Sequence, residues 1–465
     1  MAAYTVSSCL TIQVYALFGK NPFAKGSKID SDWSDITDYV MDFKTKSGRA
    51  NYVVDFPPSM ADITLKNQDR RFDPTFTTGA YAASGKSNVK VGVRIRIIGN
   101  YTNGAGTKKL ALYDGHAIDW KQKFINNGTV LVCKLKCADR LFLAQNYRYI
   151  ASRGAETPVA RYVNILPALS ASADSSDYVW QSTANYDGTG FASSNTVPAK
   201  TYDESALTAL RQIAISAVTN FKMSASGMFT WFRLPRNADA PMSDSRTRYN
   251  GYVSLVTLDP TESLPPTASS TGIAYQSVRF SSNLGKVVNE VRFAPEGTTT
   301  FQTAQNTDDF KVFGVQSLSY SQQLYNTTAI AKANASVLMN AMRDADILVD
   351  QVSVVMDTKT YIPAADSAWD KFIMGIIGEE TDVSVTDYTG TYVVDYNTLT
   401  VSIPMPDSTT QTVTGLRAGL ELSLNRIDKR FIVKINIEPL ALARVWVLGK
   451  TGFSELGEST VLTIP

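Results

Sequence analysis

The chain has 465 residues, in which 45 Lys and Arg balance 43 Asp and Glu to a formal net charge of +2. This even balance excludes a protein whose main task is to hold a polyanion, because phosphate contacts need a net basic face. Charged residues make up only 19% of the chain, below the usual share of about 25%, so we expect weakly charged surface to be buried between subunits. At roughly 100–200 residues per domain, the length predicts about three domains.

Strand patterns dominate the first 150 residues. Apolar and polar side chains alternate, as on half-buried strands, at 11–15, 52–56, 61–65, 89–97 and 112–120. In the fourth stretch Lys90, Arg94 and Arg96 would share one face, opposite a face of Val and Ile, so we expect this strand to have a wet side or a polar partner. Short strands between Gly, Asn and Asp turns predict a β-barrel or sandwich for residues 1–150.

The next segment, 151–235, is predicted to be an α+β insert. Thr201 and Glu204 fit a capping box. Apolar residues at helical spacing follow them and predict a helix over 203–219. Two short apolar runs on either side of a turn at Gly227 then predict a β-hairpin.

The remaining chain is predicted to hold two further β domains. Residues 236–365 begin with a proline-rich stretch unsuited to central sheet and carry a helix over 327–343 that runs into a strong strand at 347–356. Residues 366–465 begin with a short helix over 366–377, followed by strands and a terminal tail segment. The predicted fold class is therefore mainly β with α+β inserts: two β-barrel or sandwich domains, each carrying an inserted helical or α+β domain, as in a hub.

The chain has a single histidine, His116, and this restricts the possible catalytic and metal sites more than any other feature of the composition. A single imidazole excludes zinc sites of the HExxH type and most histidine-rich metal clusters. A Ser-His-Asp triad would have to use His116, which lies in a strand-like stretch, and the sequence has no GxSxG elbow. We therefore predict no catalytic, cofactor-binding or metal-binding residues and no enzymatic activity, with His116 as a surface or packing residue.

Four aspartates crowd one stretch near the N-terminus: Asp30, Asp32, Asp35 and Asp38. A calcium loop needs oxygen ligands at alternating positions and a glycine at the sixth. Here Trp33 interrupts the spacing and an aspartate stands where the glycine is needed. Turn and helix-capping roles are therefore the better interpretation.

The three cysteines, Cys9, Cys133 and Cys137, give no disulfide framework. The last two lie four positions apart on a predicted strand, which separates them by ~13 Å, too far for a disulfide. We predict two buried thiols and a reducing compartment. In agreement with this, we find no targeting segment and no run of about 18 apolar residues that would predict a membrane span.

The most distinctive local motif is Asp69-Arg70-Arg71-Phe72-Asp73-Pro74. One interpretation is a turn in which Arg and Asp side chains pair and the proline ends a strand. The other is a polar clamp at a subunit contact, where Arg is enriched and bidentate pairing fixes the register. The candidate contact residues come from this motif and from the C-terminal segment, and are Arg70, Arg71, Phe72, Trp446, Phe453 and Leu456.

Several weak motifs follow one another along nearly the whole chain. They are the stretches 32–40 and 62–74, the strand pair 91–97 and 112–120, the strand end 137–141, and the ending 446–460. In order and spacing they resemble the minor tail proteins of long, flexible-tailed phages, of the kind that infect actinobacteria. That family is similar to the central baseplate hub of contractile-tailed phages.

The resemblance implies a structural tail-tip hub in the virion, assembled in the host cytoplasm. It implies two barrel domains, each with an insert, and a homotrimer that alternates barrels to mimic a six-fold ring. The implied partners are the distal tail protein, the tape-measure protein and other minor tail proteins. DNA would pass through the hub without specific binding. Some relatives carry a peptidase or wall-cleaving domain after the hub, and we expect no such lytic activity here.

Two alternative functions stay open. The first is a distal-tail ring component, normally hexameric and built on one barrel with a peripheral domain, which a count of copies per tail would separate from a trimer. The second is a protein that binds or cleaves carbohydrate of the host cell wall. Tyr and Trp on an exposed face would support stacking on sugars, although 22 Tyr scattered along strands fit ordinary packing better.

Overall fold

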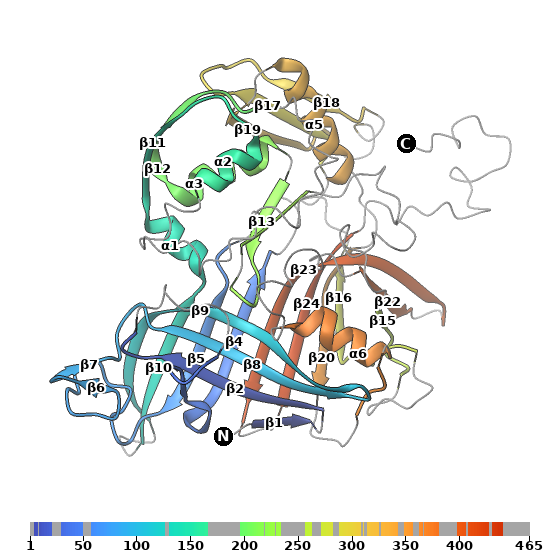
Figure 1. The fold of residues 1–465 in the computed structure, drawn as a ribbon. Coiled ribbons are helices and arrows are strands. Elements are labelled where there is room, and N and C mark those ends of the chain that lie inside the picture. The colour runs from blue at the N-terminus through green and yellow to red at the C-terminus, as the bar shows by residue number, and fades with distance from the viewer. Residues whose placement is uncertain are drawn as a thin grey trace.

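The structure is a computed structural model, which describes residues 4–7, 9–20, 29–49, 57–125, 130–165, 196–217, 219–227, 229–233, 256–262, 271–281, 288–307, 310, 314–324, 327–342, 348–356, 362–365, 367–380, 398–405, 408–426 and 430–439. The described residues form a mainly β fold. A large sheet occupies the lower part of Figure 1, and a lobe of helices and short strands stands above it.

The large sheet has fifteen strands in the described part of the chain. They are β1 (Tyr4–Ser7), β2 (Leu10–Leu17), β3 (Ser34–Asp35), β4 (Val40–Gly48), β5 (Met60–Lys66), β8 (Arg94–Asn103), β9 (Gly106–Ile125), β10 (Val130–Ala138), β15 (Val256–Leu258), β16 (Ser277–Ser281), β20 (Leu348–Met356), β21 (Glu379–Glu380), β22 (Thr398–Pro404), β23 (Thr410–Asn425) and β24 (Arg430–Pro439). The main path is antiparallel throughout and runs β1-β2-β8-β9-β10-β5-β4-β23-β24-β20-β16. β3, β15, β21 and β22 attach beside this path.

The pairing of β4 with β23 places strands from the N-terminal and C-terminal parts of the chain in one sheet. Gly48 lies opposite Gly419, and Phe43 lies opposite Leu424. The side chains of the large sheet form one buried cluster that draws on both the N-terminal and the C-terminal strands. Two of the predicted domains therefore share a sheet, and the predicted domain boundaries stay a prediction.

The upper lobe contains four helices and three small sheets among the described residues (Figure 1). The helices are α1 (Arg140–Asn146), α2 (Pro158–Ile165), α3 (Ala206–Ser216) and α5 (Thr328–Met342). The sheets are β11 (Arg148–Arg153) with β12 (Lys200–Ser205), β13 (Thr219–Met223) with β14 (Phe229–Arg233), and β18 (Gln302–Gln305), β17 (Glu290–Pro295) and β19 (Ser317–Gln323). In the described part of the chain, no helix is long and apolar enough to cross a membrane.

Two separate cores stabilise this lobe. In the first, Tyr162, Leu210 and Phe221 pack together among α1, α2, α3 and the β13–β14 hairpin. In the second, Phe293 of β17 packs with Ala331 and other small residues of α5. The two cores meet at α3 and at the end of β19, because Leu324 belongs to the first core and Ile215 packs against the second.

The predicted capping box is wrong, although the helix and hairpin exist. Thr201 and Glu204 lie in β12, where backbone pairing with β11 holds them in extended conformation. α3 instead begins after Ser205, whose Oγ accepts a hydrogen bond from the backbone N of Thr208 at 3.1 Å. The hairpin is confirmed: β13 and β14 pair antiparallel, and Gly227 has a φ of +84° in the turn between them.

The strand predicted over 89–97 begins later than expected. A turn at Gly92, with a φ of +92°, precedes β8, and Val91 is 66% exposed instead of facing a core. Arg94 and Arg96 are buried, so neither lies on a wet face. We expected this strand to have either a wet side or a polar partner, and the structure shows a polar partner, Asp114.

Other predicted elements agree with the structure. The helix predicted over 327–343 is α5, and the strand predicted over 347–356 is β20. The short helix predicted over 366–377 consists of α6 (Ala368–Phe372), whose Ser367 cap accepts from the backbone N of Asp370, and a π-helical turn (Ile373–Ile377). The strand predicted over 52–56 lies outside the described residues.

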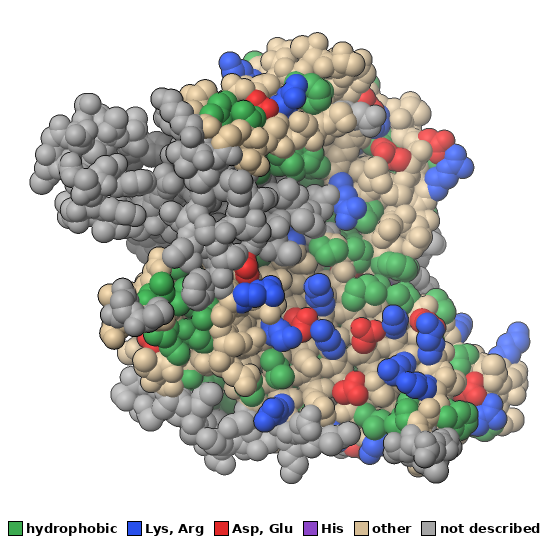
Figure 2. Space-filling model, turned by 180° about the vertical axis from the view of Figure 1, so that it is seen from behind, with side chains coloured by type: hydrophobic (Ala, Val, Ile, Leu, Met, Phe, Trp, Pro, Cys, Tyr) green, Lys and Arg blue, Asp and Glu red, His purple; other side chains and the backbone are tan. Residues whose placement is uncertain are grey.

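The outward face of the large sheet carries charges of both signs. Along β10, β5, β4, β23 and β24 the outward side chains include Lys134, Lys136, Asp62, Lys66, Asp42, Lys44, Lys46, Glu421 and Lys434. Figure 2 shows basic and acidic side chains interspersed over the lower half of the molecule, where this sheet lies. Glu421 pairs with both Lys44 and Lys434 at 3.1 Å. The surface therefore mixes both signs, with carboxylates interspersed among a larger number of lysines.

Candidate functional site

The motif Asp69–Pro74 forms a turn directly after β5, held by its own ion pairs. Nε and Nη2 of Arg70 donate to Oδ2 of Asp73 at 3.0 and 2.7 Å, and Nε of Arg71 donates to Oδ2 of Asp69 at 2.6 Å. Arg70 has a φ of +59°, a left-handed conformation that is uncommon for a residue with a side chain. The predicted turn with paired Arg and Asp side chains is confirmed, but Pro74 does not end a strand, because β5 ends at Lys66.

Phe72 anchors this turn in an aromatic cluster. Its side chain is fully buried, with ring centroids 5.5 Å from Tyr39, 5.6 Å from Tyr81 and 6.3 Å from Trp120. The guanidinium of Arg71 lies over the Tyr39 ring at 4.0 Å, where cation and ring attract. The cluster therefore fixes the turn to the large sheet.

The predicted subunit contacts differ in their availability to a partner. The side chains of Arg70 and Arg71 are 52% and 23% exposed, so both can reach a neighbouring chain. Phe72 cannot, because its own chain buries it completely, and we correct that part of the prediction. Its contribution to any contact is to hold the turn in place. The remaining three candidates, Trp446, Phe453 and Leu456, lie outside the described residues.

Asn67, which was not among the candidate residues predicted from the sequence, stabilises the turn through hydrogen bonds. It is fully buried; its Oδ1 accepts from the backbone N of Phe72 at 2.8 Å, and its Nδ2 donates to Oε1 of Gln122 at 2.5 Å. Gln122 in turn donates from Nε2 to the carbonyl of Phe72 at 2.8 Å. The three residues form a closed hydrogen-bond ring around the base of the turn.

We expect Asn67→Ala to lower the free energy of unfolding by about 1–3 kcal/mol, because it leaves buried polar groups without partners. Urea unfolding of the full chain measures this. Lys66→Ala is the matched control, since Lys66 precedes Asn67 and is exposed. An unchanged midpoint for Asn67→Ala would show that the ring does not hold the turn.

A buried charge cluster lies between β8 and β9. Arg94 donates from Nε and Nη2 to Oδ1 and Oδ2 of Asp114 at 2.9 and 2.7 Å, and Nε of Arg96 lies 2.8 Å from Oδ2 of the same carboxylate. All three side chains are at most 2% exposed. Burial acts to raise the pKa of Asp114, but the charges of Arg94 and Arg96 outweigh it and lower that pKa below its usual range. One carboxylate therefore stays ionised between two guanidinium groups.

The tip of the β13–β14 hairpin rests on this cluster. A Cβ on Gly227 would lie 2.8 Å from Cγ of Asp114, closer than real Cβ atoms come, and the positive φ disfavours a side chain as well. Only glycine fits at this place. The contact fixes the hairpin of the first insert against the large sheet.

His116 lies two residues after Asp114, opposite Arg94 in the register of β8 and β9. It is 1% exposed, so it is a packing residue and not a surface one. Burial lowers the pKa of His116 to about 3, and the positive charges of Arg140 and Arg94 act in the same direction. The imidazole is therefore neutral at neutral pH.

We expect His116→Gln to gain stability relative to the natural chain as the pH falls below 6.5. The unfolded histidine titrates near pH 6.5 and the folded one near 3, so between these values the unfolded state binds more protons and the natural chain loses stability on acidification. The variant lacks this loss, so its free energy of unfolding should rise relative to the natural chain by up to about 1.4 kcal/mol per pH unit.

The measurement is urea unfolding of both chains between pH 7 and pH 4. Asp139 titrates in the opposite sense, because burial raises its pKa to about 7 and the folded state then binds the extra proton. Both chains contain Asp139, so its contribution cancels in the difference. A difference in stability that stays constant with pH would contradict the neutral, buried histidine.

Aspartates at turns and strand ends cap the backbone. Asp139 follows β10 and caps α1: its Oδ1 accepts from the backbone N of Leu141 at 2.9 Å, and its Oδ2 from that of Ser59 at 2.7 Å. Asp30 and Asp35 each accept from a backbone N two residues on at 2.9 Å, which confirms turn and capping roles. Among the described residues, no group of three or more His, Cys, Asp or Glu side chains could hold a metal ion.

The three cysteines are buried and form no disulfide, as predicted for Cys133 and Cys137. Burial raises the pKa of Cys133 to about 12 and that of Cys137 well above its usual value. Both thiols therefore stay protonated and unreactive, in the interior of the large sheet.

Comparison with known proteins gives similarity to solved structures only: no family model and no curated protein matches the chain. A tail protein from Neisseria meningitidis MC58 is 10% identical with a TM-score of 0.49, over 92% of this chain and 96% of that one. The prophage MuSo2 43 kDa tail protein from Shewanella oneidensis is 8% identical with a TM-score of 0.48, over 92% and 98%. Prophage tail protein gp18 from Listeria monocytogenes EGD-e is 8% identical with a TM-score of 0.42, over 91% and 94%. Since each TM-score is below 0.5, the function of this chain has to be argued from its own residues.

Proposed function

We propose that the chain is a structural hub protein at the tail tip of a long-tailed phage. In this role it forms a homotrimer that links the tail tube and the distal tail protein to further tip proteins and surrounds the channel through which DNA leaves. It belongs to the virion, is assembled in the host cytoplasm and has no enzymatic activity.

The proposal rests on the structural roles of three aspartates in the motifs that resemble tail-tip proteins. Asp73, Asp114 and Asp139 each belong to a different motif of the resemblance to tail-tip proteins. The first pairs with Arg70 in the turn, the second joins two buried arginines under the insert hairpin, and the third caps α1. Each thus fixes the path of the backbone at a joint between elements. Motifs that build joints support an architectural role more than a catalytic one.

The mixed charge of the sheet surface supports the proposed relation to DNA. Lys44 and Lys434 share the single carboxylate of Glu421, and Asp62 lies between Lys44 and Lys136 in the strand register. A uniformly basic surface would retain a polyanion through counterion release, whereas interspersed charges would not. A channel built from such surfaces would let DNA slide.

Light scattering of the purified full chain tests the assembly. The expected mass is three times 50.8 kDa. A mass of six chains would favour the distal-tail ring component, and a strict monomer at all concentrations would contradict the hub. Binding or hydrolysis assays with cell-wall polysaccharide test the carbohydrate alternative, and the hub proposal predicts that both are negative.

We expect Arg70→Gly to weaken self-association by about tenfold or more without unfolding the chain. Glycine accepts the positive φ of this position, and the buried carboxylate of Asp73 keeps its hydrogen bonds to Thr75, while a lost interface arginine costs affinity. Arg148→Ala is the control, because Arg148 is also exposed and also pairs with an aspartate, Asp203, in the upper lobe. Sedimentation of both variants over a concentration range measures the change, and equal association in both would remove Arg70 from the interface.

A further inference from the structure

The chain passes from the large sheet into the upper lobe at Asp139. β10 ends at Ala138 and α1 begins at Arg140, and in Figure 1 α1 lies between the sheet and the rest of the lobe. The side chain of Asp139 binds both sides of this joint: its Oδ2 accepts from the backbone N of Ser59, just before β5, at 2.7 Å, and its Oδ1 accepts from that of Leu141 in α1 at 2.9 Å. If α1 moves away from the sheet, one of these hydrogen bonds has to break.

Asp139 is a buried carboxyl without a cation. It is 2% exposed, and among the described residues it forms no ion pair. An ionised carboxylate in the interior is costly when no opposite charge compensates it. Burial therefore raises the pKa of Asp139 to about 7, although the backbone N–H groups of Ser59 and Leu141 favour the ionised form. Asp114 is the contrast, because it is similarly buried but two guanidinium groups keep it ionised.

The neighbouring titratable and charged groups do not compensate this carboxyl. On the elements packed around the joint they are Asp62, Tyr113, His116, Cys137, Arg140, Lys222 and Arg417. Burial keeps the hydroxyl of Tyr113 and the thiol of Cys137 protonated and the imidazole of His116 neutral. Arg140 acts on Asp114 and His116, and none of the three cations forms an ion pair with Asp139. Burial therefore controls the proton on Asp139 more than any neighbouring charge does.

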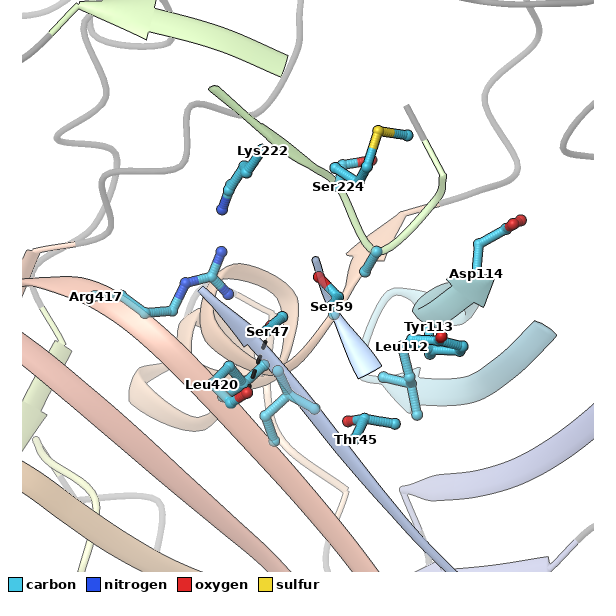
Figure 3. A pocket seen from close by; sticks show the side chains of 14 residues that line it. Thr45, Ser47, Ser59, Leu112, Tyr113, Asp114, Lys222, Ser224, Arg417 and Leu420 are labelled. Atoms are coloured by element: carbon cyan, nitrogen blue, oxygen red, sulfur yellow. Dashed lines mark hydrogen bonds between the residues drawn. The ribbon is translucent and has the colours of Figure 1, made fainter. Parts of the chain in front are cut away.

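A small polar cavity provides space for water beside the joint. Its volume is about 40 Å³, which is room for about three water molecules. Figure 3 shows it between the tip of the β13–β14 hairpin and the large sheet, with Ser59, Tyr113 and Ser224 among its lining residues. Since Ser59 belongs both to the cavity wall and to the joint, breaking its bond to Asp139 would bring the carboxylate toward water.

We propose that a proton on Asp139 holds the upper lobe against the large sheet, and that loss of this proton favours opening of the joint. The neutral carboxyl is stable in the closed, buried state. The carboxylate instead gains hydration when the bond to Ser59 breaks and water reaches it from the cavity. This inference does not depend on the proposed hub function, because it concerns a joint within one chain.

Proton linkage sets the pH range of this change. The carboxyl of Asp139 has a pKa of about 7 in the closed state, and it should return to a pKa near 4 once water surrounds it. The closed state thus binds the proton more tightly, so the open fraction rises with pH between these values and levels off above pH 7. Between pH 5.5 and pH 8.5 we expect opening to increase by about tenfold or more.

Hydrogen exchange of the full chain, followed by mass spectrometry at pH 5.5 and at pH 8.5, tests the proposal. Peptides that contain Ser59 and Leu141 are the reporters, because their backbone N–H groups bind the carboxylate directly. After correction for the intrinsic effect of pH on exchange, their protection should be lower by about tenfold or more at the higher pH. The N–H of Thr208 is the control, since its acceptor, the hydroxyl of Ser205, does not titrate.

Asp139→Asn is the matched variant, because asparagine also caps helices but carries no charge at either pH. Its corrected protection at Ser59 and Leu141 should be the same at both pH values. The proposal is overturned if the natural chain shows equal protection at both pH values, or if Asp139→Asn loses as much protection at the higher pH as the natural chain does. The first of these comparisons needs no variant, so it holds even if the substitution disturbs the fold.

Discussion

Asp114→Ala is expected to lower the free energy of unfolding by about 3–5 kcal/mol, because it leaves two buried guanidinium groups without their carboxylate. Arg94 and Arg96 are 2% and 0% exposed, so water cannot replace the lost partner without opening the sheet. The hairpin tip at Gly227 packs directly on Asp114, so the insert should loosen together with the sheet. Urea unfolding followed by tryptophan fluorescence measures the loss, since Trp120 lies on β9 and Trp33 packs against residues of β2 and β8.

Asp203→Ala is the matched control for this prediction. Asp203 forms a bidentate pair with Arg148 at 2.6 and 2.8 Å, a geometry similar to that of Asp114 with Arg94, but on the exposed surface. Exposed pairs contribute little, so the control should unfold at the natural midpoint. Equal effects of the two substitutions would show that burial does not set the strength of the Asp114 cluster.

Gly48→Ala should destabilise the chain by about 3 kcal/mol or more, at the seam where the N-terminal and C-terminal strands meet. Gly48 has a φ of +78°, and a methyl group there would overlap the carbonyl oxygen of Ala418 on β23. Opposite it, a Cβ on Gly419 would lie 2.8 Å from the carbonyl oxygen of Arg49. The backbones of β4 and β23 approach so closely here that neither position has room for a side chain.

Gly85→Ala is the control that separates the cost of a positive φ from the cost of steric overlap with the facing strand. Gly85 has a similar φ of +71°, but nothing lies within 4 Å of its Cβ position. Its substitution should therefore cost only the conformational term of about 1–2 kcal/mol. The excess of Gly48→Ala over Gly85→Ala reports the close approach of the two strands, and the absence of an excess would mean that the seam is not tightly packed.

Elements with local signals were predictable from the sequence. Period-two alternation marked β10, a glycine turn between apolar runs marked the β13–β14 hairpin, and helical spacing marked α5. The capping box at Thr201 failed because pairing with β11, some fifty residues earlier, holds that stretch as a strand. A distant partner overrides a local propensity, and no window of sequence contains it.

The sites depend even more on distant pairing. Arg94 and Arg96 look like a solvated face until Asp114 on the next strand is placed opposite them, twenty residues later in the chain. The turn at Arg70 was recognisable as a motif, but the ring through Asn67 needs Gln122 from β9. The sequence showed which residue types were present, but it did not predict which of them would be in contact.

A cryo-EM map of purified tails from the phage that encodes this chain tests the proposed hub function. If the chain is the hub, the map should show three copies at the tip, arranged around an open channel, with the turn at Arg70 and Arg71 against a neighbouring copy. A map with no density for this chain in the tail would contradict it.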